Sequence, residues 1–153
     1  MSDYTKNHSP EGAVLTALIL ETFRLNGRLL AVGDDLTNDL GLTSARWQVV
    51  GAIEKEPLPV AQIARNMGLT RQAVQRVANV LADKGLVEFA ENPNHRRAQL
   101  VRLTSKGRTA LEKVSQRQVE WSNHHAEGLG TEKIEEALMV LRTLRQRLES
   151  DKP

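Results

Sequence analysis

The sequence predicts a mainly α-helical protein with a small antiparallel β-sheet of two or three strands, and three observations lead to this fold class. Two short helical patterns meet at a glycine within residues 58–84. Two strand patterns, separated by a loop with paired arginines, follow within residues 86–103. Long helical patterns occupy residues 13–35 and 108–150. We therefore expect a compact central lobe between terminal helices.

Length and composition limit the class of protein. The 153 residues and the 40% apolar content fit one subunit that can bury a core, and the lack of cysteine excludes disulfides and thiolate metal sites. Residues 1–12 are polar, which predicts a flexible tail and does not match a secretory signal. Charged and amide side chains interrupt the longest apolar stretch, Ala13 to Val32, so no membrane segment is predicted. A cytoplasmic protein with no membrane partner is expected.

Basic residues are concentrated in the central block. The whole chain has a formal net charge of only +2, but residues 61–108 contain nine Lys or Arg and three acidic residues, a net charge of +6. The rest of the chain therefore carries −4. A positive field confined to one block fits a polyanionic partner, with a merely solvated basic face as the alternative.

Three helices are predicted before residue 68. Residues 13–32 are apolar around more than one stripe, so this helix needs partners on several sides. Thr43 or Ser44 can cap a second helix that runs to Ile53. Val60 to Met67 form a third, with Pro59 in its first turn and Gly68 in the turn that follows.

A fourth helix begins after Thr70, which can cap it, and runs to about Lys84, where Gly85 closes it. At about 100° per residue, its apolar and polar side chains fall on opposite sides. The apolar side holds Ala73, Val74, Val77, Ala78, Val80 and Leu81, and the polar side holds Arg71, Gln72, Gln75, Arg76 and Asn79.

The remaining elements are two strands and two long helices. Residues 86–91 and 98–103 are rich in Val, Leu and Phe, and the six residues between them are too many for a tight hairpin turn, so that loop should project. A long helix opens within residues 103–107 and ends by Gly128, and another begins after Thr131. The last helix has the apolar spacing of a coiled coil and needs a partner helix. Its seam is Ile134, Ala137, Leu141, Leu144 and Leu148.

The polar side of the fourth helix is suited to reading DNA. A helix fits the major groove, where Arg can bridge guanine O6 and N7, and Gln or Asn can bridge adenine N6 and N7. This side has no acid before Asp83, whereas an ordinary solvated helix face, the alternative, usually alternates Glu with Lys. The predicted DNA-binding residues are Thr70, Arg71, Gln72, Gln75, Arg76 and Asn79, of which Asn79 should meet the DNA backbone or solvent.

Other basic residues are predicted to contact DNA nearby. Arg96 and Arg97 lie on the projecting loop, where a guanidinium can enter a narrow minor groove or clamp phosphates. Ion pairs with the chain's own acidic helices are the alternative. Arg102 and Lys106, like Thr70, are predicted phosphate contacts, which set register and affinity without reading sequence.

Three motifs together resemble the MarR (multiple-antibiotic-resistance-regulator) family of winged-helix transcription factors. They are LTSARW at residues 42–47, IARNMGLTRQAVQRVANVLADKGLVE at residues 63–88, and the paired arginines closing on LVRLTSKG at residues 100–107. In helix order, the resemblance extends over residues 13–150.

The resemblance implies a winged helix-turn-helix lobe at residues 42–107. It also implies a homodimer formed by N-terminal helix 13–35 and C-terminal helices 108–150, with recognition helices in neighbouring major grooves of double-stranded DNA. A small-molecule effector, often an aromatic acid or phenol, would bind between the dimer region and the lobe.

The wing departs from the family pattern. Family members commonly carry an acid-Pro-x-acid-Arg-Arg run, whereas this chain has Asn92-Pro93-Asn94-His95-Arg96-Arg97, and Phe89 stands where an arginine is usual. The second acid looks suited to orienting an arginine through a charged hydrogen bond, which His95 cannot accept in the same way. Minor-groove contact by this wing therefore has less support. His95 either makes the wing pH-sensitive or has no role.

Other functions have less support in the sequence. An enzyme lacks its parts, because there is no cysteine, Gly-rich phosphate loop or nucleophile motif. His124 and His125 come nearest to a metal site, but adjacent helical residues point about 100° apart and do not converge on one ion. The few aromatic residues do not favour single-strand binding. No enzyme, metal site or cofactor is predicted, and a protein-docking winged helix is the strongest alternative.

The prediction is thus a sequence-specific regulator, a homodimeric repressor of a pseudo-palindromic operator with recognition helices about 34 Å apart. An aromatic or phenolic effector is expected to release the DNA. Arg46 and Trp47 are the candidates for its pocket, although Trp47 at helical spacing also suits the core. The alternatives are a protein-interaction module and a regulator without a small-molecule effector.

Overall fold

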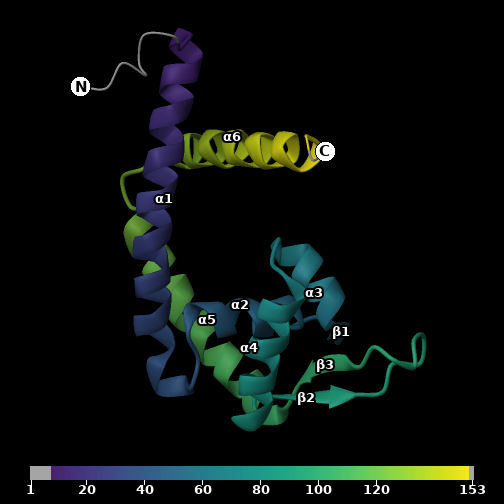
Figure 1. Ribbon diagram of the computed structural model, residues 1–153. Helices are drawn as coiled ribbons and strands as arrows, with labels where there is room; N and C mark the ends of the chain where they lie inside the picture. Colours follow the sequence, from purple (N-terminus) through teal and green to yellow (C-terminus); the bar gives the residue numbers. More distant parts are fainter. Residues whose placement is uncertain (1–7, 152–153) are drawn as a thin grey trace. The chain divides into compact units, whose positions relative to one another are not determined.

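The computed structural model describes residues 8–151 and divides between Val114 and Ser115 into two compact units. Helices and a three-stranded antiparallel sheet confirm the predicted fold class (Figure 1). The second unit holds the rest of α5 and all of α6 (Thr131–Ser150). The first unit holds α1 (Pro10–Thr37), the 3-10 helix η2 (Asn38–Leu40), α2 (Ser44–Ala52), β1 (Leu58–Pro59), α3 (Val60–Met67), α4 (Arg71–Asp83), β2 (Val87–Ala90), β3 (Leu100–Leu103) and the start of α5 (Ser105–Ala126).

Helix α1 extends beyond residues 13–35 at both ends. The Ser9 hydroxyl accepts a hydrogen bond from the backbone N–H of Gly12 at 3.1 Å, and Pro10 occupies the first turn. Both residues favour a helix start. Pro10–Gly12, expected in a polar tail over residues 1–12, are therefore helical. Residues 1–7 of that tail lie outside the described residues.

A close contact between Gly33 and Ser44 joins the end of α1 to α2. Any side chain at Gly33 would collide with the Ser44 hydroxyl, which donates a hydrogen bond to the carbonyl of Leu30 at 2.6 Å. The N–H of Ser44 donates to the Asp34 carboxylate at 2.7 Å, and the Thr37 hydroxyl donates to the carbonyl of Gly33 at 2.7 Å. This corner therefore depends on satisfied polar groups as well as packing.

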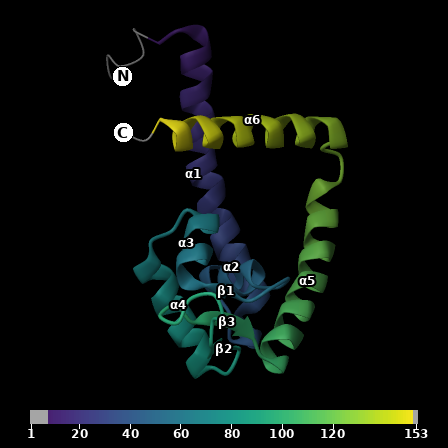
Figure 2. The ribbon, with the colours of Figure 1, turned by 90° about the vertical axis from the view of Figure 1, so that its right-hand side faces the viewer.

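The core of the first unit lies among α2, α3, α4, the sheet and the start of α5 (Figure 2). Of the two predicted cap candidates, Thr43 and Ser44, Thr43 caps α2, because its hydroxyl accepts the Arg46 N–H at 3.3 Å. Ile63 and Ala64 of α3 face inward, as the sequence predicts, and Met67 is half-buried. Side chains that are at most 1% exposed are Val49, Val50, Ile63, Val74, Ala78, Leu81, Leu86, Val101 and Val114.

The sheet has the strand order β1-β3-β2. The two predicted strands are confirmed but are shorter, and β3 lies between β2 and the two-residue strand β1. Pro59 was expected in the first turn of α3; instead it is the N-cap of α3 and pairs with Leu100 at the sheet edge. An edge position suits proline, which has no N–H to donate to a neighbouring strand.

The turn after α4 is held by the start of α5. The Thr104 hydroxyl donates to the carbonyl of Gly85 at 2.6 Å, and the Lys106 ammonium donates to the carbonyl of Lys84 at 2.8 Å. Gly107 packs so closely on the backbone between α4 and β2 that a side chain there would collide with it. Carbonyl groups at the end of α4 are thus satisfied by α5, which ties the two helices together.

The second unit consists of the last part of α5 and α6. The turn between them contains Gly128 and Gly130, both with positive φ, as expected where a helix ends and another begins. No residue of α6 is buried, and Leu144 is the one half-buried member of its predicted seam. Within residues 8–151, no helix is long and apolar enough to cross a membrane.

Candidate DNA-binding surface

Helix α4 separates its apolar side from its polar side as the angular map predicts. The Thr70 hydroxyl caps it by accepting the Ala73 N–H at 3.2 Å. Val74, Ala78 and Leu81 are buried, and the other apolar residues are half-buried. The exposed residues of the polar side are Arg71, Gln72, Gln75, Arg76 and Asn79. The two faces are thus confirmed, whereas contacts of these residues with DNA stay predictions.

Asn79 has a partner within α4 that the sequence analysis did not assign. Its side-chain oxygen accepts a hydrogen bond from Nε2 of Gln75 at 2.9 Å, one helical turn earlier. The other Nε2 hydrogen and the Oε1 of Gln75 take no part in that bond, so the amide retains the donor and acceptor that reading an adenine edge requires. The contact could have been predicted from the sequence, because side chains four residues apart on a helix are neighbours.

A hollow of about 330 Å³ lies between α4 and the wing formed by β2, β3 and their loop. Arg71, Gln72 and Gln75 of α4 line one side, and Arg97 and Gln99 of the wing line the other. Segments far apart in the sequence therefore bring two guanidinium groups to one concave surface. Gln99 belongs to no motif and was missed, although it lies only two residues after Arg97. The apolar lining is Pro59, Val60, Ala61, Phe89 and Ala98.

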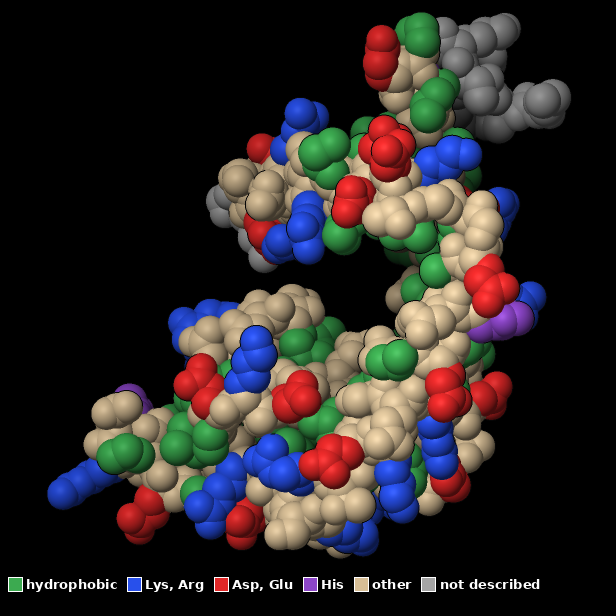
Figure 3. Space-filling model, turned by 180° about the vertical axis from the view of Figure 1, so that it is seen from behind, with side chains coloured by type: hydrophobic (Ala, Val, Ile, Leu, Met, Phe, Trp, Pro, Cys, Tyr) green, Lys and Arg blue, Asp and Glu red, His purple; other side chains and the backbone are tan. Residues whose placement is uncertain are grey.

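Local hydrogen bonds shape the wing loop although it lacks the acids of its family pattern. The Asn92 side-chain oxygen accepts the N–H of Asn94 at 3.0 Å, and the Asn92 carbonyl accepts the N–H of His95 at 3.1 Å. An amide oxygen therefore caps the turn there. Arg96 and Arg97 are exposed and form no ion pair with any residue from 8 to 151, and basic side chains project from the wing tip in Figure 3.

The two predicted phosphate contacts near the wing already have partners within the chain. Arg102 Nε donates to the Glu88 carboxylate at 2.7 Å across β2 and β3, and both side chains are about half exposed. Lys106 bonds to the carbonyl of Lys84. To contact a phosphate, Arg102 must share its guanidinium with the Glu88 carboxylate or leave it, and Lys106 must do the same with the carbonyl of Lys84.

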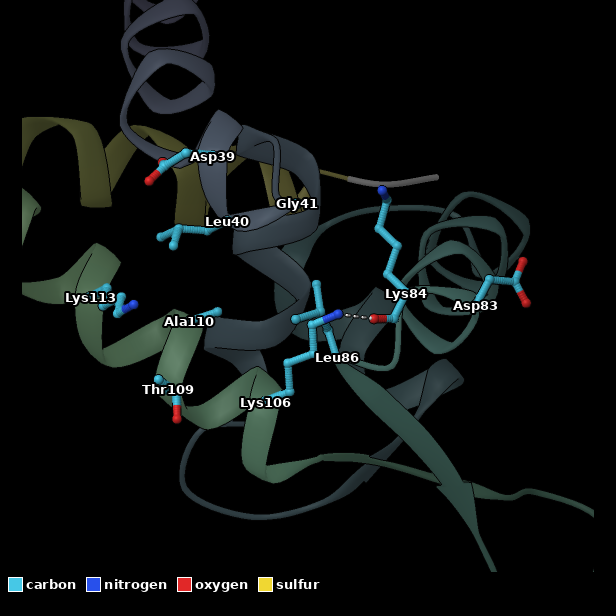
Figure 4. A pocket seen from close by; sticks show the side chains of 10 residues that line it. All are labelled: Asp39, Leu40, Gly41, Asp83, Lys84, Leu86, Lys106, Thr109, Ala110 and Lys113. Carbon is cyan, nitrogen blue, oxygen red and sulfur yellow. Dashed lines mark hydrogen bonds between the residues drawn. The ribbon is translucent and has the colours of Figure 1, made fainter.

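The structure places Arg46 and Trp47 on α2, away from the hollow beside α4. Arg46 Nη1 donates to the carbonyl of Gly41 at 3.3 Å. Trp47 is half-buried and packs against the core. Neither residue lines that hollow or a second hollow, of about 640 Å³, between η2, the end of α4 and the start of α5 (Figure 4). The packing of Trp47 therefore matches its alternative assignment to the core.

His124 and His125 are exposed on the last turns of α5. Nδ1 of His125 lies 2.8 Å from the carbonyl of Trp121, and its ring stacks on that of Trp121 with centroids 4.4 Å apart. Among residues 8–151, no group of three or more His, Asp or Glu could hold a metal ion. The rings of His124 and His125 meet edge to face, with centroids 5.0 Å apart.

Sequence comparisons identify related proteins. A family model described as MarR family matches residues 40–98, which include α2, α3, α4 and the wing loop. The uncharacterized protein Rv2011c of Mycobacterium tuberculosis is 34% identical over 139 residues, covering 91% of this chain and 97% of the relative. The HTH-type transcriptional regulator TcaR of Staphylococcus aureus is 29% identical over 119 residues, covering 76% of this chain and 78% of TcaR.

A solved structure supports the same fold. The crystal structure of the MarR family transcription regulator SP03579 matches with a TM-score of 0.80 at 18% identity, covering 93% of this chain and 97% of the other. At this identity the likeness shows the fold. Together with the matched family model and the full-length relative, it shows that the chain belongs to the MarR family of DNA-binding transcription regulators.

Proposed function

We propose that the chain is a homodimeric repressor that occupies a pseudo-palindromic operator, with α4 of each subunit in the major groove. The observation that carries this proposal is the exposed side of α4, which holds five Arg, Gln or Asn side chains and no acid before Asp83, the last residue of the helix. Arg97 of the wing lines the hollow beside it. MarR-family regulators are non-enzymatic DNA-binding proteins, so the proposal concerns the operator, the assembly and the roles of single residues.

The N-terminal half of α4 supplies the proposed base contacts. Arg71, Gln72, Gln75 and Arg76 have exposed side chains there, and this half of a recognition helix enters the groove in helix-turn-helix proteins. Thr70 already accepts the Ala73 N–H, but its hydroxyl hydrogen can still be donated to a phosphate. Asn79 acts through Gln75, whose amide it holds.

The wing supplies the proposed backbone and minor-groove contacts. Arg97 lines the same hollow as Arg71 of α4, so its guanidinium can bind a phosphate beside the groove that α4 enters. Arg96 is exposed on the loop and is assigned to the minor groove. The Arg102–Glu88 pair is half exposed, so it is worth only about 0–1 kcal/mol, and Arg102 can exchange Glu88 for a phosphate. Lys106 is retained as a weaker phosphate contact.

Exposed apolar residues on α1 and α6 support the proposed homodimer. Val14 and Phe23 of α1 are each 71% exposed, and Leu148 of α6 is 63% exposed. Large apolar side chains that are exposed along two helices indicate a surface that binds another protein. To read adjacent major grooves on one face of DNA, the proposed two-fold dimer must hold its two copies of α4 about 34 Å apart.

A dimer bound at the promoter would block transcription. A small effector would release the DNA if it favours a dimer in which the two DNA-binding lobes lie at a different distance from each other. An effector can shift the equilibrium between the DNA-binding dimer and the released dimer only as far as it binds one of these two states more tightly than the other. Two alternatives remain testable: a regulator without an effector, and a winged helix that docks on protein. The docking alternative predicts weak DNA binding that changes little with salt, whereas several phosphate contacts make affinity fall steeply with salt.

The test begins with selection of bound duplexes from a random DNA pool, followed by fluorescence anisotropy on the selected sequence. Arg71→Ala should weaken binding about 10- to 100-fold, because a bidentate base contact supplies about 1–3 kcal/mol of discrimination. Lys55→Ala, which removes an exposed cation from the turn after α2, serves as the control. Unchanged affinity and sequence preference for Arg71→Ala would contradict the assignment of α4.

A further inference from the structure

The hollow between α4 and the wing has a polar rim and an apolar floor. Five exposed side chains form the rim: Arg71, Gln72, Gln75, Arg97 and Gln99. Five half-buried side chains form the floor: Pro59, Val60, Ala61, Phe89 and Ala98. No floor side chain can donate or accept a hydrogen bond. Burial therefore divides the lining into two layers of different chemistry.

The charge of the rim is entirely positive. None of the ten lining residues is acidic, and the guanidinium groups of Arg71 and Arg97 form no ion pair with any residue from 8 to 151. The second hollow (Figure 4) differs, because both signs of charge line it: Asp39 and Asp83 with Lys84, Lys106 and Lys113. A rim with cations and no carboxylate suits a phosphate.

Phe89 provides the largest side chain of the floor. It lies opposite Val101 in the pairing of β2 with β3 and packs against the core, which holds its ring in place. In the family pattern an arginine is usual at this position. An arginine would bring a third guanidinium to the hollow, next to those of Arg71 and Arg97, whereas phenylalanine makes the floor apolar. The apolar floor is therefore a feature of this chain and not of the family pattern.

One strand of the DNA faces this hollow in the proposed complex. With α4 in the major groove and Arg96 in the neighbouring minor groove, the strand that separates the two grooves passes between α4 and the wing. Each unit of that strand has a charged phosphate and a deoxyribose whose C2′ carries only hydrogen. The phosphate suits Arg97 of the rim, and the C2′ methylene suits the apolar floor.

We propose that the floor of this hollow is a deoxyribose subsite, in which Phe89, Val60 and Ala98 pack on C2′ of one sugar and select against a ribose there. The inference rests on the proposed function, because it requires α4 in the major groove. A ribose would press its 2′-hydroxyl against side chains that cannot bond to it, so the hydroxyl would lose water without gaining a partner. The 2′-hydroxyl is the group by which a protein distinguishes RNA from DNA at a given site.

The test is fluorescence anisotropy on the selected duplex, with each sugar of one half-site replaced in turn by ribose. Ribose at one or two neighbouring positions should weaken binding about tenfold, a difference of about 1.4 kcal/mol, and elsewhere it should change little. A 2′-fluoro sugar at the same position is the matched control. It favours the ring pucker of ribose but has no hydroxyl, so it should weaken binding less than about threefold.

Two variants test the floor itself. Phe89→Arg restores the usual residue, so the effect of ribose should fall below about threefold, and affinity should fall more steeply with salt, by about 0.9 in the log–log slope. Ala98→Ser supplies a hydroxyl that can bond to the 2′-hydroxyl, so it should reduce the effect of ribose and leave the salt slope unchanged. Lys55→Ala, outside the hollow, should alter neither.

Three outcomes would overturn the subsite and leave the proposed function intact. The first is equal affinity for the unmodified duplex and every ribose-substituted duplex. The second is a 2′-fluoro sugar that weakens binding as much as ribose, because ring pucker would then be the cause. The third is an unchanged effect of ribose in both Phe89→Arg and Ala98→Ser. The ribose scan uses the unaltered protein, so it decides the question even if Phe89→Arg does not fold. A protein that selects no duplex would overturn the proposed function itself.

Discussion

Helices α4 and α6 are both amphipathic in sequence, but the structure treats their apolar sides differently. Val74, Ala78 and Leu81 of α4 are completely buried within the first unit. No residue of α6 is buried, and Met139 and Leu148 are more than 60% exposed. The apolar side of α4 thus has its partners within the first unit, whereas α6 has no buried residue in the part of the chain from 8 to 151.

The difference indicates which side of each helix is available for binding. With its apolar side packed, α4 presents Arg, Gln and Asn over residues 71–79, and its exposed acid, Asp83, lies at its C-terminal end. The exposed side over residues 71–79 suits the hydrated, charged surface of DNA. The apolar seam of α6 suits another apolar helix, which a second copy of the chain would supply in the proposed homodimer. One amphipathic pattern therefore serves two functions, according to which side the fold covers.

The largest effect is expected from removing a packed side chain of α4. Leu81→Ala should lower the free energy of unfolding by about 2–5 kcal/mol, because it leaves a cavity in a close-packed core. Leu148→Ala on α6 should lower it by less than about 1 kcal/mol, because surface substitutions have small effects. Urea unfolding followed by circular dichroism measures both.

Protein concentration is the control for this pair. If α6 is stabilised by a second chain, the small effect of Leu148→Ala should depend on protein concentration, and that of Leu81→Ala should not. If both variants lost the same free energy of unfolding at every protein concentration, α6 would be packed within one chain as firmly as α4. The difference between the two helices would then not exist.

The next effect concerns the partner of α6. Leu141→Glu places a charge in the middle of the predicted seam, so we expect the dimer dissociation constant to rise about 100-fold. Glu136→Gln, an exposed change on the same helix, should alter it little. Analytical ultracentrifugation provides the readout, and an unaltered protein that is monomeric at micromolar concentration would contradict the proposed assembly.

Periodicity was sufficient to predict the helices, because burial repeats with the geometry of the element. The angular map of α4 placed Val74 and Leu81 inward and Arg71 and Gln75 outward, and burial agrees at each position. Local caps were also predictable, since Thr43 and Thr70 act within three residues of their own position.

Features that depend on contacts across space were not predictable in this way. Strand β1 is two residues long and is defined only by its pairing with β3, so no alternation marks it. Both hollows combine segments that are distant in the sequence, and no local pattern relates Lys84 to Lys113 or Arg71 to Arg97. For the same reason the Arg102–Glu88 pair required the register of the sheet.

The smallest effect tests whether Asn79 acts through Gln75. Asn79→Ala leaves the Gln75 side chain present but removes its acceptor, so operator binding should weaken by about 0.5–1 kcal/mol, less than the loss from Gln75→Ala. If Asn79 only orients Gln75, then Asn79→Ala should have no further effect in Gln75→Ala protein. Fluorescence anisotropy on the unaltered protein, the two single variants and the double variant measures the coupling energy between Asn79 and Gln75. Additive losses would instead mean that Asn79 contacts DNA itself, whereas the sequence alone predicted that it meets the DNA backbone or solvent, and the contact surface of α4 would extend one turn further.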